Sequence, residues 1–251
     1  MPMARVDLNC DLGEEAGHDT ELMPLITSAN IACGAHAGDR ETMRATVELA
    51  KRHGVAIGAH PGFADRENFG RREIEISPAV AAVLVGEQVQ ILRDIAVRAG
   101  TVVSHVKLHG ALYNMVSRDK GLAEAVVNAI WTMEKSLGLF VLSGSELERV
   151  ARGNRDLNVT SEVFADRTYQ ADGSLTPRVR PAALINDEDV AVAQVLRMVR
   201  DGVVRATDGT DVRLRAETIC LHGDGPHPVA FAQRLNRELR AAGVAIQAPG
   251  Q

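Results

Sequence analysis

Apolar and polar residues alternate strictly along residues 5–12, which read RVDLNCDL. Alternation with a period of two is typical of a β-strand, because successive side chains point to opposite faces. One face of this strand is apolar, and the other carries Asp7, Asn9 and Asp11. Such a face is either the solvent side of an antiparallel strand or part of a site. The strand–helix order of the rest of the chain favours a site, since parallel sheets are buried on both faces.

A second polar strand face occurs in residues 102–114, which read VVSHVKLHGALYN. His105, Lys107 and His109 share one face, while the opposite face is mostly apolar. Ionisable groups gathered on one short face are costly to bury unless they have partners or a shared function. The alternative is a frayed strand end whose polar groups meet water. Because the same pattern recurs in other segments, a functional cluster is the preferred interpretation.

The remaining chain alternates between strand and helix patterns. Strands are expected at residues 28–36, 55–60, 139–144, 158–166 and 217–224. Helices are expected at about 40–52, 78–98, 119–136, 146–152, 187–201 and 227–242, with a small hairpin over 204–214. Seven strands in this order predict an α/β fold, a single (β/α)7 barrel-like domain over residues 1–251 that is related to the TIM barrel. A doubly wound open sheet is the alternative.

Composition narrows the class of protein. The chain has 251 residues, a net charge of −5 and 45% apolar residues, enough for a sizeable core. The acidic balance argues against nucleic acid as a main partner, because phosphate binding needs a basic surface. No apolar run is long enough to span a bilayer, and no secretory pattern opens the chain. Three scattered cysteines fit a reducing cytosol, so a cytoplasmic location is expected.

Ionisable residues follow or end most of the expected strands. In parallel α/β folds the carboxyl ends of the strands meet at one side of the sheet, where ligands bind. Side chains expected at this end belong to Asp11, His36, His60, Lys107, His109, Asp166, His222 and Asp224. The sequence contains no phosphate-binding P-loop, dinucleotide-binding glycine motif, nucleophile elbow or H-E-x-x-H motif. The chemistry therefore depends on this Asp, His and Lys cluster.

Two kinds of chemistry fit the cluster. His36, His60 and Asp11 provide three ligands from separate strands, as in catalytic zinc sites that keep an open position. General acid–base catalysis by Asp11, His36, His60 or His109 needs no metal, since imidazole titrates near neutral pH. The sequence leaves this choice open.

Cationic side chains are candidates for binding anions. Lys107 either opposes the charge of an anionic intermediate or forms a salt bridge with Asp7 or Asp11. Loop arginines either clamp a substrate carboxylate or are solvated surface residues; they are Arg71, Arg72, Arg178 and Arg180.

Seven segments in order along the chain resemble the LamB/YcsF family, the A subunits of 5-oxoprolinase. They read DLNCDLGE (7–14), SANIACGAHAGD (28–39), VAIGAHPGF (55–63), FGRR (69–72), HVKLHGALYN (105–114), SEVFADRTYQADG (161–173) and ICLHGD (219–224). Two positions depart from the expected pattern: Ala35 stands where phenylalanine is expected, and Leu108 where proline is expected.

The resemblance implies an ATP-hydrolysing hydrolase that acts on a cyclic amide, opening the lactam of 5-oxo-L-proline to L-glutamate. It also implies a complex with subunits B and C, ATP with Mg²⁺ as cofactor, and kinship with the glycoside hydrolase and deacetylase barrels. A divalent metal on this chain and homo-oligomerisation stay open. Nucleic acid and membrane partners are not expected.

The pattern and the resemblance together predict the site residues. The catalytic candidates are Asp11, His36, His60, Lys107, His109 and Asp224. The substrate-binding candidates are Asn9, Asn30, Tyr113, Asn114, Glu162, Arg72 and Arg180. The metal candidates are His36, His60 and Asp11. Two alternative functions remain: a metal-dependent deacetylase-like hydrolase, and a non-catalytic subunit that only binds substrate.

Overall fold

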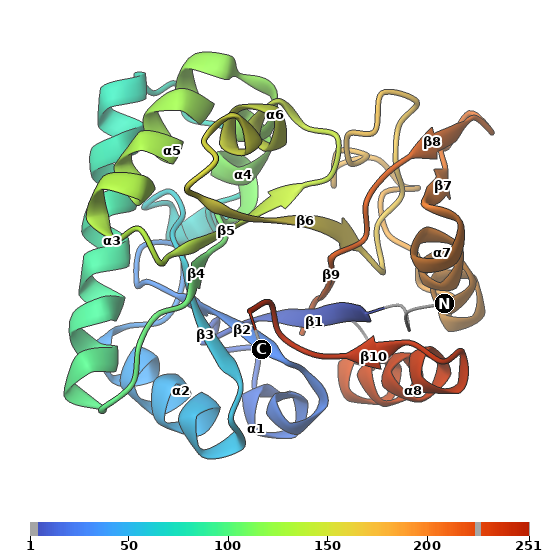
Figure 1. Ribbon diagram of the computed structural model, residues 1–251, viewed down its shortest axis with the longest axis horizontal. Coiled ribbons are helices and arrows are strands. Elements are labelled where there is room, and N and C mark those ends of the chain that lie inside the picture. The colour runs from blue at the N-terminus through green and yellow to red at the C-terminus, as the bar shows by residue number, and fades with distance from the viewer. Residues whose placement is uncertain (1–4, 224–226, 251) are drawn as a thin grey trace.

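Parallel strands close into a ring in the computed structural model, which describes residues 5–223 and 227–250. Strand β1 pairs with β2 on one side and with β9 on the other, and this pairing closes the barrel. The seven strands are β1 (Arg5–Leu12), β2 (Ser28–Ala32), β3 (Ala56–His60), β4 (His105–Val106), β5 (Gly138–Leu142), β6 (Asn158–Phe164) and β9 (Thr218–Leu221). The predicted (β/α)7 barrel is confirmed (Figure 1), and the open sheet is excluded.

Helices surround the outside of the ring (Figure 1). They are α1 (Asp19–Leu22), α2 (Arg40–His53), α3 (Pro78–Arg98), α4 (Gly110–Arg118), α5 (Lys120–Met133), α6 (Glu146–Gly153), α7 (Glu188–Asp201) and α8 (Pro228–Ala241). Short 3₁₀ turns, η1 (Met23–Leu25) and η2 (Arg66–Asn68), lie in two of the loops. The six expected helices are present. Helices α1 and α4 are additional, and α4 begins directly after His109, within the segment expected to be a strand.

Capping residues fix where the helices begin. The side chain of Asp39 accepts hydrogen bonds from the backbone N–H groups of Glu41 and Thr42, which satisfies the free donors of the first turn of α2. Ser77 caps α3 in the same way, and Pro78 occupies the first turn, where its missing N–H is not needed. Both starts agree with the sequence prediction.

Three further strands lie outside the ring. The expected hairpin forms from β7 (Val203–Arg205) and β8 (Asp211–Arg213), which pair antiparallel. Strand β10 (Ala245–Ile246) pairs in parallel with the beginning of β1 and was not anticipated. Within residues 5–223 and 227–250, no helix combines the length and apolar character needed to cross a membrane.

The inner face of the barrel is polar. The apolar residues of β1, among them Leu8 and Cys10, are fully buried in the hydrophobic core. The alternating polar residues Asp7, Asn9 and Asp11 are also buried, and Asn9 and Asp11 bond to side chains of other barrel strands. The barrel therefore holds a stack of hydrogen-bonded polar groups between its two ends, and this stack supports the groups at the carboxyl end.

Asp7, a buried residue on the inner face of β1, is expected to make the stability of the fold depend on pH. Asp7 accepts hydrogen bonds from the hydroxyls of Thr27, Ser28 and Thr218. Burial nevertheless raises the pKa of Asp7 from 3.8 to about 6. The folded state therefore keeps a proton that the unfolded state releases between pH 4 and 6. The stability associated with this proton is present below about pH 4 and is lost as the pH rises to about 6.

Asp7→Asn removes this titration without changing the side-chain shape. We expect the free energy of unfolding of the variant, relative to the parent, to increase between pH 4 and 7 by roughly 2–3 kcal/mol, because one pKa unit corresponds to about 1.4 kcal/mol. Urea unfolding of both chains at several pH values measures this difference. If the difference in the free energy of unfolding between variant and parent stays constant from pH 4 to 7, the pKa of Asp7 is not raised by folding.

Candidate active site

A cavity of about 480 Å³ lies at the carboxyl ends of the barrel strands. Its size suits a small-molecule ligand. Ionisable and polar side chains from several strand ends line it, including Asp11, Glu14, His60, Lys107, His109, Tyr113, Asn114 and His222. Arg71, Arg167 and Arg178 add positive charge to its lining, and Phe164 adds an aromatic surface. The structure thus brings polar residues that are far apart in sequence into one cavity.

Lys107 is a buried cation in the lining of the cavity. Its Nζ lies 2.7 Å from Asp11 Oδ1 and 3.1 Å from Glu162 Oε1. Two weaker contacts join Nζ to Asn9 Oδ1 at 3.3 Å and to Cys220 Sγ at 3.0 Å. Burial on its own disfavours the charged amine, but the carboxylates of Asp11 and Glu162 outweigh this and hold the pKa of Lys107 well above its ordinary value. Lys107 is therefore a fixed positive charge and not a proton acceptor.

Asp11 joins this cation to the imidazoles. Its Oδ1 accepts hydrogen bonds from Lys107 and, at 2.9 Å, from Asn30 Nδ2. Its Oδ2 lies 3.2 Å from His60 Nε2. Burial on its own raises the pKa of Asp11, but His60 and Lys107 more than offset this and hold it well below its usual value. Asp11 is thus an anion at neutral pH, and its charge fixes the positions of its neighbours.

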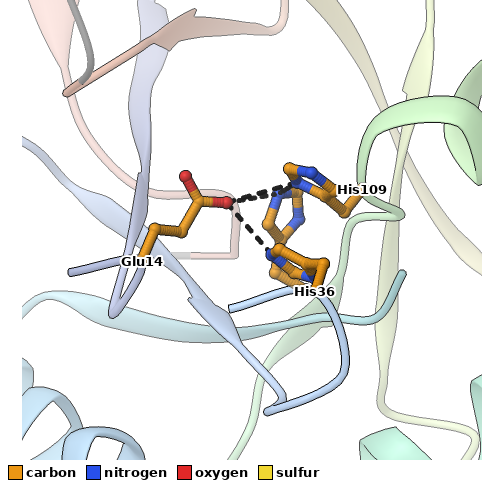
Figure 2. Close-up of side chains that lie close together, drawn as sticks. Glu14, His36 and His109 are labelled. Atoms are coloured by element: carbon orange, nitrogen blue, oxygen red, sulfur yellow. Dashed lines mark hydrogen bonds and ion pairs between the residues drawn. The ribbon is translucent and has the colours of Figure 1, made fainter. Parts of the chain in front are cut away.

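Three imidazoles surround a second carboxylate; we call this group the Glu14 cluster (Glu14, His36, His60 and His109). Glu14 Oε1 lies 3.1 Å from His36 Nε2, 3.2 Å from His109 Nδ1 and 3.7 Å from His60 Nε2. Figure 2 shows the Glu14 carboxylate pointing towards His36 and His109. Glu14, His36 and His109 come from the segments that follow β1, β2 and β4, and His60 is the last residue of β3.

Burial keeps two imidazoles of this cluster, those of His36 and His109, neutral. It lowers the pKa of His36 to about 4, although the hydrogen bond to Glu14 acts in the opposite direction. It also lowers the pKa of His109. Burial on its own raises the pKa of Glu14, but the close contacts with His109 and His36 lower it well below its ordinary value. At neutral pH Glu14 is therefore a carboxylate beside the uncharged rings of His36 and His109.

A histidine–aspartate pair forms another part of the wall. His222 Nδ1 lies 2.9 and 2.8 Å from the two carboxylate oxygens of Asp166. Burial on its own raises the pKa of Asp166, but His222 outweighs this and lowers it. Because the carboxylate accepts the Nδ1 proton, a ring with a single proton has its lone pair on Nε2, which lies 4.0 Å from Cys220 Sγ. An imidazole oriented in this way is suited to accept a proton from water.

The predicted catalytic residues come together for the most part. Asp11, His60, Lys107 and His109 line the cavity. His36 lies behind them, stacked on His109 with ring centroids 3.7 Å apart. Asp224 lies outside the described residues.

The predicted substrate-binding residues lie in three places: two line the cavity, three lie in the barrel interior, and two arginines lie outside the cavity lining. Tyr113 and Asn114 line the cavity, and Tyr113 donates a 2.8 Å hydrogen bond to Glu162. Asn9, Asn30 and Glu162 lie in the barrel interior, fully buried and hydrogen-bonded to one another or to Lys107.

Arg72 and Arg180 do not line the cavity. Arg72 is largely exposed and lies 3.5 Å from Asp65, and Arg180 is exposed. Arg71 and Arg178, the neighbouring members of the same loops, line the cavity in their place. Within a loop no period tells which of two nearby arginines faces inward, so the sequence offered no basis for this choice.

The sequence-based site also lacked Glu14, although the DLGE segment contains it. Glu14 lies two residues beyond β1, past Gly13, whose positive φ of 70° turns the chain back over the barrel. The strand period that placed Asp11 therefore does not extend to Glu14. His222 and Asp166 were expected at strand ends, but no role was predicted for their pairing.

The closed barrel and its ionisable cavity define an α/β-barrel protein with the features of an enzyme. The chain belongs to the LamB/YcsF family, whose model matches residues 6–251. It is 53% identical to the A subunit of 5-oxoprolinase from Geobacillus kaustophilus over 98% of each chain. The crystal structure of the lactam utilization protein from Thermus thermophilus superposes with a TM-score of 0.89 at 42% identity, covering 97% of this chain and 99% of that one.

A more distant likeness concerns the fold alone. The peptidoglycan deacetylase PdaC from Bacillus subtilis has a TM-score of 0.53 at 10% identity, covering 100% of this chain and 90% of that one. The expected kinship with deacetylase barrels is thus confirmed as a likeness of architecture.

Proposed function

We propose that this chain is the A subunit of an ATP-dependent 5-oxoprolinase and opens the lactam ring of 5-oxo-L-proline to give L-glutamate, in a complex with subunits B and C. The observation that carries the proposal is the 53% identity, over 98% of both chains, to a relative named as the A subunit of 5-oxoprolinase. We also propose that residues 1–251 form one barrel domain. Three unpaired, buried cysteines are consistent with action in a reducing cytosol.

The cavity supplies groups that this reaction needs. A lactam carbonyl is a poor electrophile, and transfer of the γ-phosphoryl group of ATP to its oxygen creates a leaving group. Water then attacks the carbonyl carbon, and the ring C–N bond breaks as the nitrogen gains a proton, which leaves an acyl phosphate. A second water hydrolyses this acyl phosphate to the carboxylate of glutamate and free phosphate. The fixed charge of Lys107 opposes the negative charge that develops on oxygen. The Nε2 lone pair of His222 is suited to take the proton of the attacking water.

The proposed reaction consumes ATP with Mg²⁺, although we find no nucleotide-binding motif in the sequence of this chain. The sequence has no P-loop. We therefore propose that the nucleotide binds where this chain meets its partner subunits, so that the phosphoryl group is delivered to the open side of the cavity. The arginines in the lining of the cavity suit a substrate that carries both a carboxylate and, transiently, a phosphoryl group.

Arg178 provides a test of substrate binding. Arg178→Met is expected to raise the KM for 5-oxoproline about 10- to 100-fold with a smaller effect on kcat, because a charge-assisted hydrogen bond contributes about 1.5–3 kcal/mol. Arg180→Met is the matched control: Arg180 lies two residues away, is exposed and does not line the cavity. Steady-state kinetics of the three-subunit complex measure both variants. Equal KM values for Arg178→Met and the parent would remove Arg178 from the binding site.

The proposal is tested by measuring glutamate release from 5-oxoproline by the chain with subunits B and C. We expect release that requires ATP. Glutamate release without ATP, or removal of acetyl groups from acetylated sugars by the chain alone, would favour the deacetylase-like alternative. That alternative rests at present on a likeness of fold at 10% identity, which shows no activity.

A further inference from the structure

The Glu14 cluster places four possible metal-ligand atoms close together. Glu14 Oε1 contacts His36 Nε2 and His109 Nδ1, and His109 Nδ1 lies 2.9 Å from His60 Nε2. One donor atom from each of the four residues lies within 4.8 Å of all the others. We propose that the Glu14 cluster binds one divalent transition-metal ion at the wall of the cavity.

The hydrogen bonds behind the rings determine which nitrogens carry protons. His60 Nδ1 lies 2.7 Å from the carbonyl oxygen of Lys107, and His109 Nε2 lies 2.8 Å from that of Phe69. A carbonyl oxygen only accepts, so each of these two nitrogens carries a proton. In a ring that carries a single proton, the opposite nitrogen, which faces Glu14 and the other ring, then has a lone pair available for a metal. Donation of the outer N–H to a backbone carbonyl is the usual support of a metal-ligating histidine.

Without a cation this arrangement is unfavourable. Two nitrogen lone pairs face each other at 2.9 Å beside a carboxylate, where an ordinary hydrogen bond would need a proton between each pair of atoms. His36 adds a further ring nitrogen to the same group, and its other nitrogen, Nδ1, is buried without a hydrogen-bond partner. Groups that are buried in this way, and not satisfied by one another, point to a missing ligand.

Two glycines allow the rings to converge. A Cβ atom at Gly62 would lie 2.9 Å from His36 Nδ1 and 3.0 Å from His109 Cβ. A Cβ atom at Gly70 would lie 2.9 Å from His36 Cβ, and Gly70 has a positive φ of 62° that other residues rarely adopt. The backbone of this loop is therefore shaped around the stacked rings of His36 and His109.

The proposed ligand set differs from the one predicted from the sequence. Asp11 was expected to bind the metal with His36 and His60. Its Oδ1 is instead 2.7 Å from the ammonium of Lys107, so an ion bound there would lie beside a fixed positive charge. The same ammonium argues against a metal held by Asp11, Cys220 and His222, because it lies 3.0 Å from Cys220 Sγ.

The ligand types indicate which ions to expect. Imidazole nitrogens suit zinc, iron, nickel and copper, whereas magnesium and calcium prefer oxygen ligands. Three imidazoles and one carboxylate therefore favour a transition metal over the Mg²⁺ that accompanies ATP. Glu14, His60 and His109 line the cavity, so such an ion would supply Lewis-acid polarisation at its wall.

The test measures metal content and does not depend on lactam activity, so it can fail while the proposed function stands. The purified chain is incubated separately with Zn²⁺, Mn²⁺, Co²⁺ and Mg²⁺, freed of excess metal and analysed by plasma mass spectrometry. We expect about one equivalent of at least one transition metal and none of Mg²⁺. The bound ion should also raise the melting temperature, and EDTA should reverse the increase.

Glu14→Gln and His109→Gln should each lower the affinity for the metal at least about tenfold, because even supporting residues of metal sites have effects of 10- to 100-fold. His53→Gln is the matched control, since His53 is exposed at the end of α2. Circular dichroism shows whether each variant is folded. A parent chain that takes up no transition metal overturns the proposal, as does undiminished binding by both folded variants.

Discussion

Replacing Lys107 by methionine is expected to lower the rate of ATP-dependent glutamate release about 10²- to 10³-fold, the usual effect of losing one group that stabilises a developing negative charge. Methionine keeps much of the side-chain length and removes the ammonium. Lys107 lines the cavity, and the adjacent carboxylates keep it protonated. The measurement is kcat of the complex reconstituted with the variant. A parental rate would show that Lys107 has no catalytic role.

The same substitution should also lower stability, and here the structure changes an expectation drawn from the sequence. Polar groups at a strand end are seldom optimal for stability, which by itself predicts a small change in melting temperature. Lys107, however, is 2% exposed and contacts two buried carboxylates, Asp11 and Glu162. Removing one partner of a buried ion pair typically costs about 3–5 kcal/mol. Activity must therefore be measured at a temperature where circular dichroism shows a folded variant.

Asp11→Asn is expected to lower glutamate release about 10²- to 10⁴-fold, the range associated with a catalytic carboxylate, with a smaller loss of stability. The amide oxygen can still accept hydrogen bonds from Lys107 and Asn30, and the new NH₂ group can donate to His60 Nε2. The fold is therefore retained while the charge that orients Lys107 and His60 is removed. The measurements are kcat and the melting temperature of the reconstituted complex.

Asp94→Asn is the matched control, because Asp94 is exposed on α3 and its charge lies outside the cavity lining. The double variant Asp11→Asn/Lys107→Met gives a further test. If the two residues act as one pair, the double variant loses little more than the worse single variant. Fully multiplicative losses would show that the 2.7 Å contact between them does not matter for the reaction.

The fold was largely predictable because its determinants are local. The alternation in residues 5–12 and the caps Asp39 and Ser77 place elements by the period of the backbone and by single hydrogen bonds. Helix α4 was missed because His105, Lys107 and His109 alternate as in a longer strand, although β4 has only two residues. Strand β10 was missed because two residues carry too little periodicity to be recognised.

The site was predictable only where a strand period placed the residue. Asp11, His60 and Lys107 follow the period of β1, β3 and the segment around β4, and the structure brings them together. Glu14 comes after a glycine turn, so its return to the cavity depends on tertiary structure. The same limit applies to the choice between Arg71 and Arg72. Packing across the barrel determines which oxygen of Asp11 faces Lys107. No local sequence pattern specifies this orientation.

The most direct test of the central claim is an omission experiment on the reconstituted enzyme. Glutamate release from 5-oxoproline and ATP is measured with subunits B and C alone, with the parent chain added, and with Asp11→Asn added. We expect release with the parent chain but not with subunits B and C alone, and release reduced at least about 10²-fold with the variant. Equal release by subunits B and C alone would contradict it, and an undiminished rate with Asp11→Asn would show that the ring opens elsewhere.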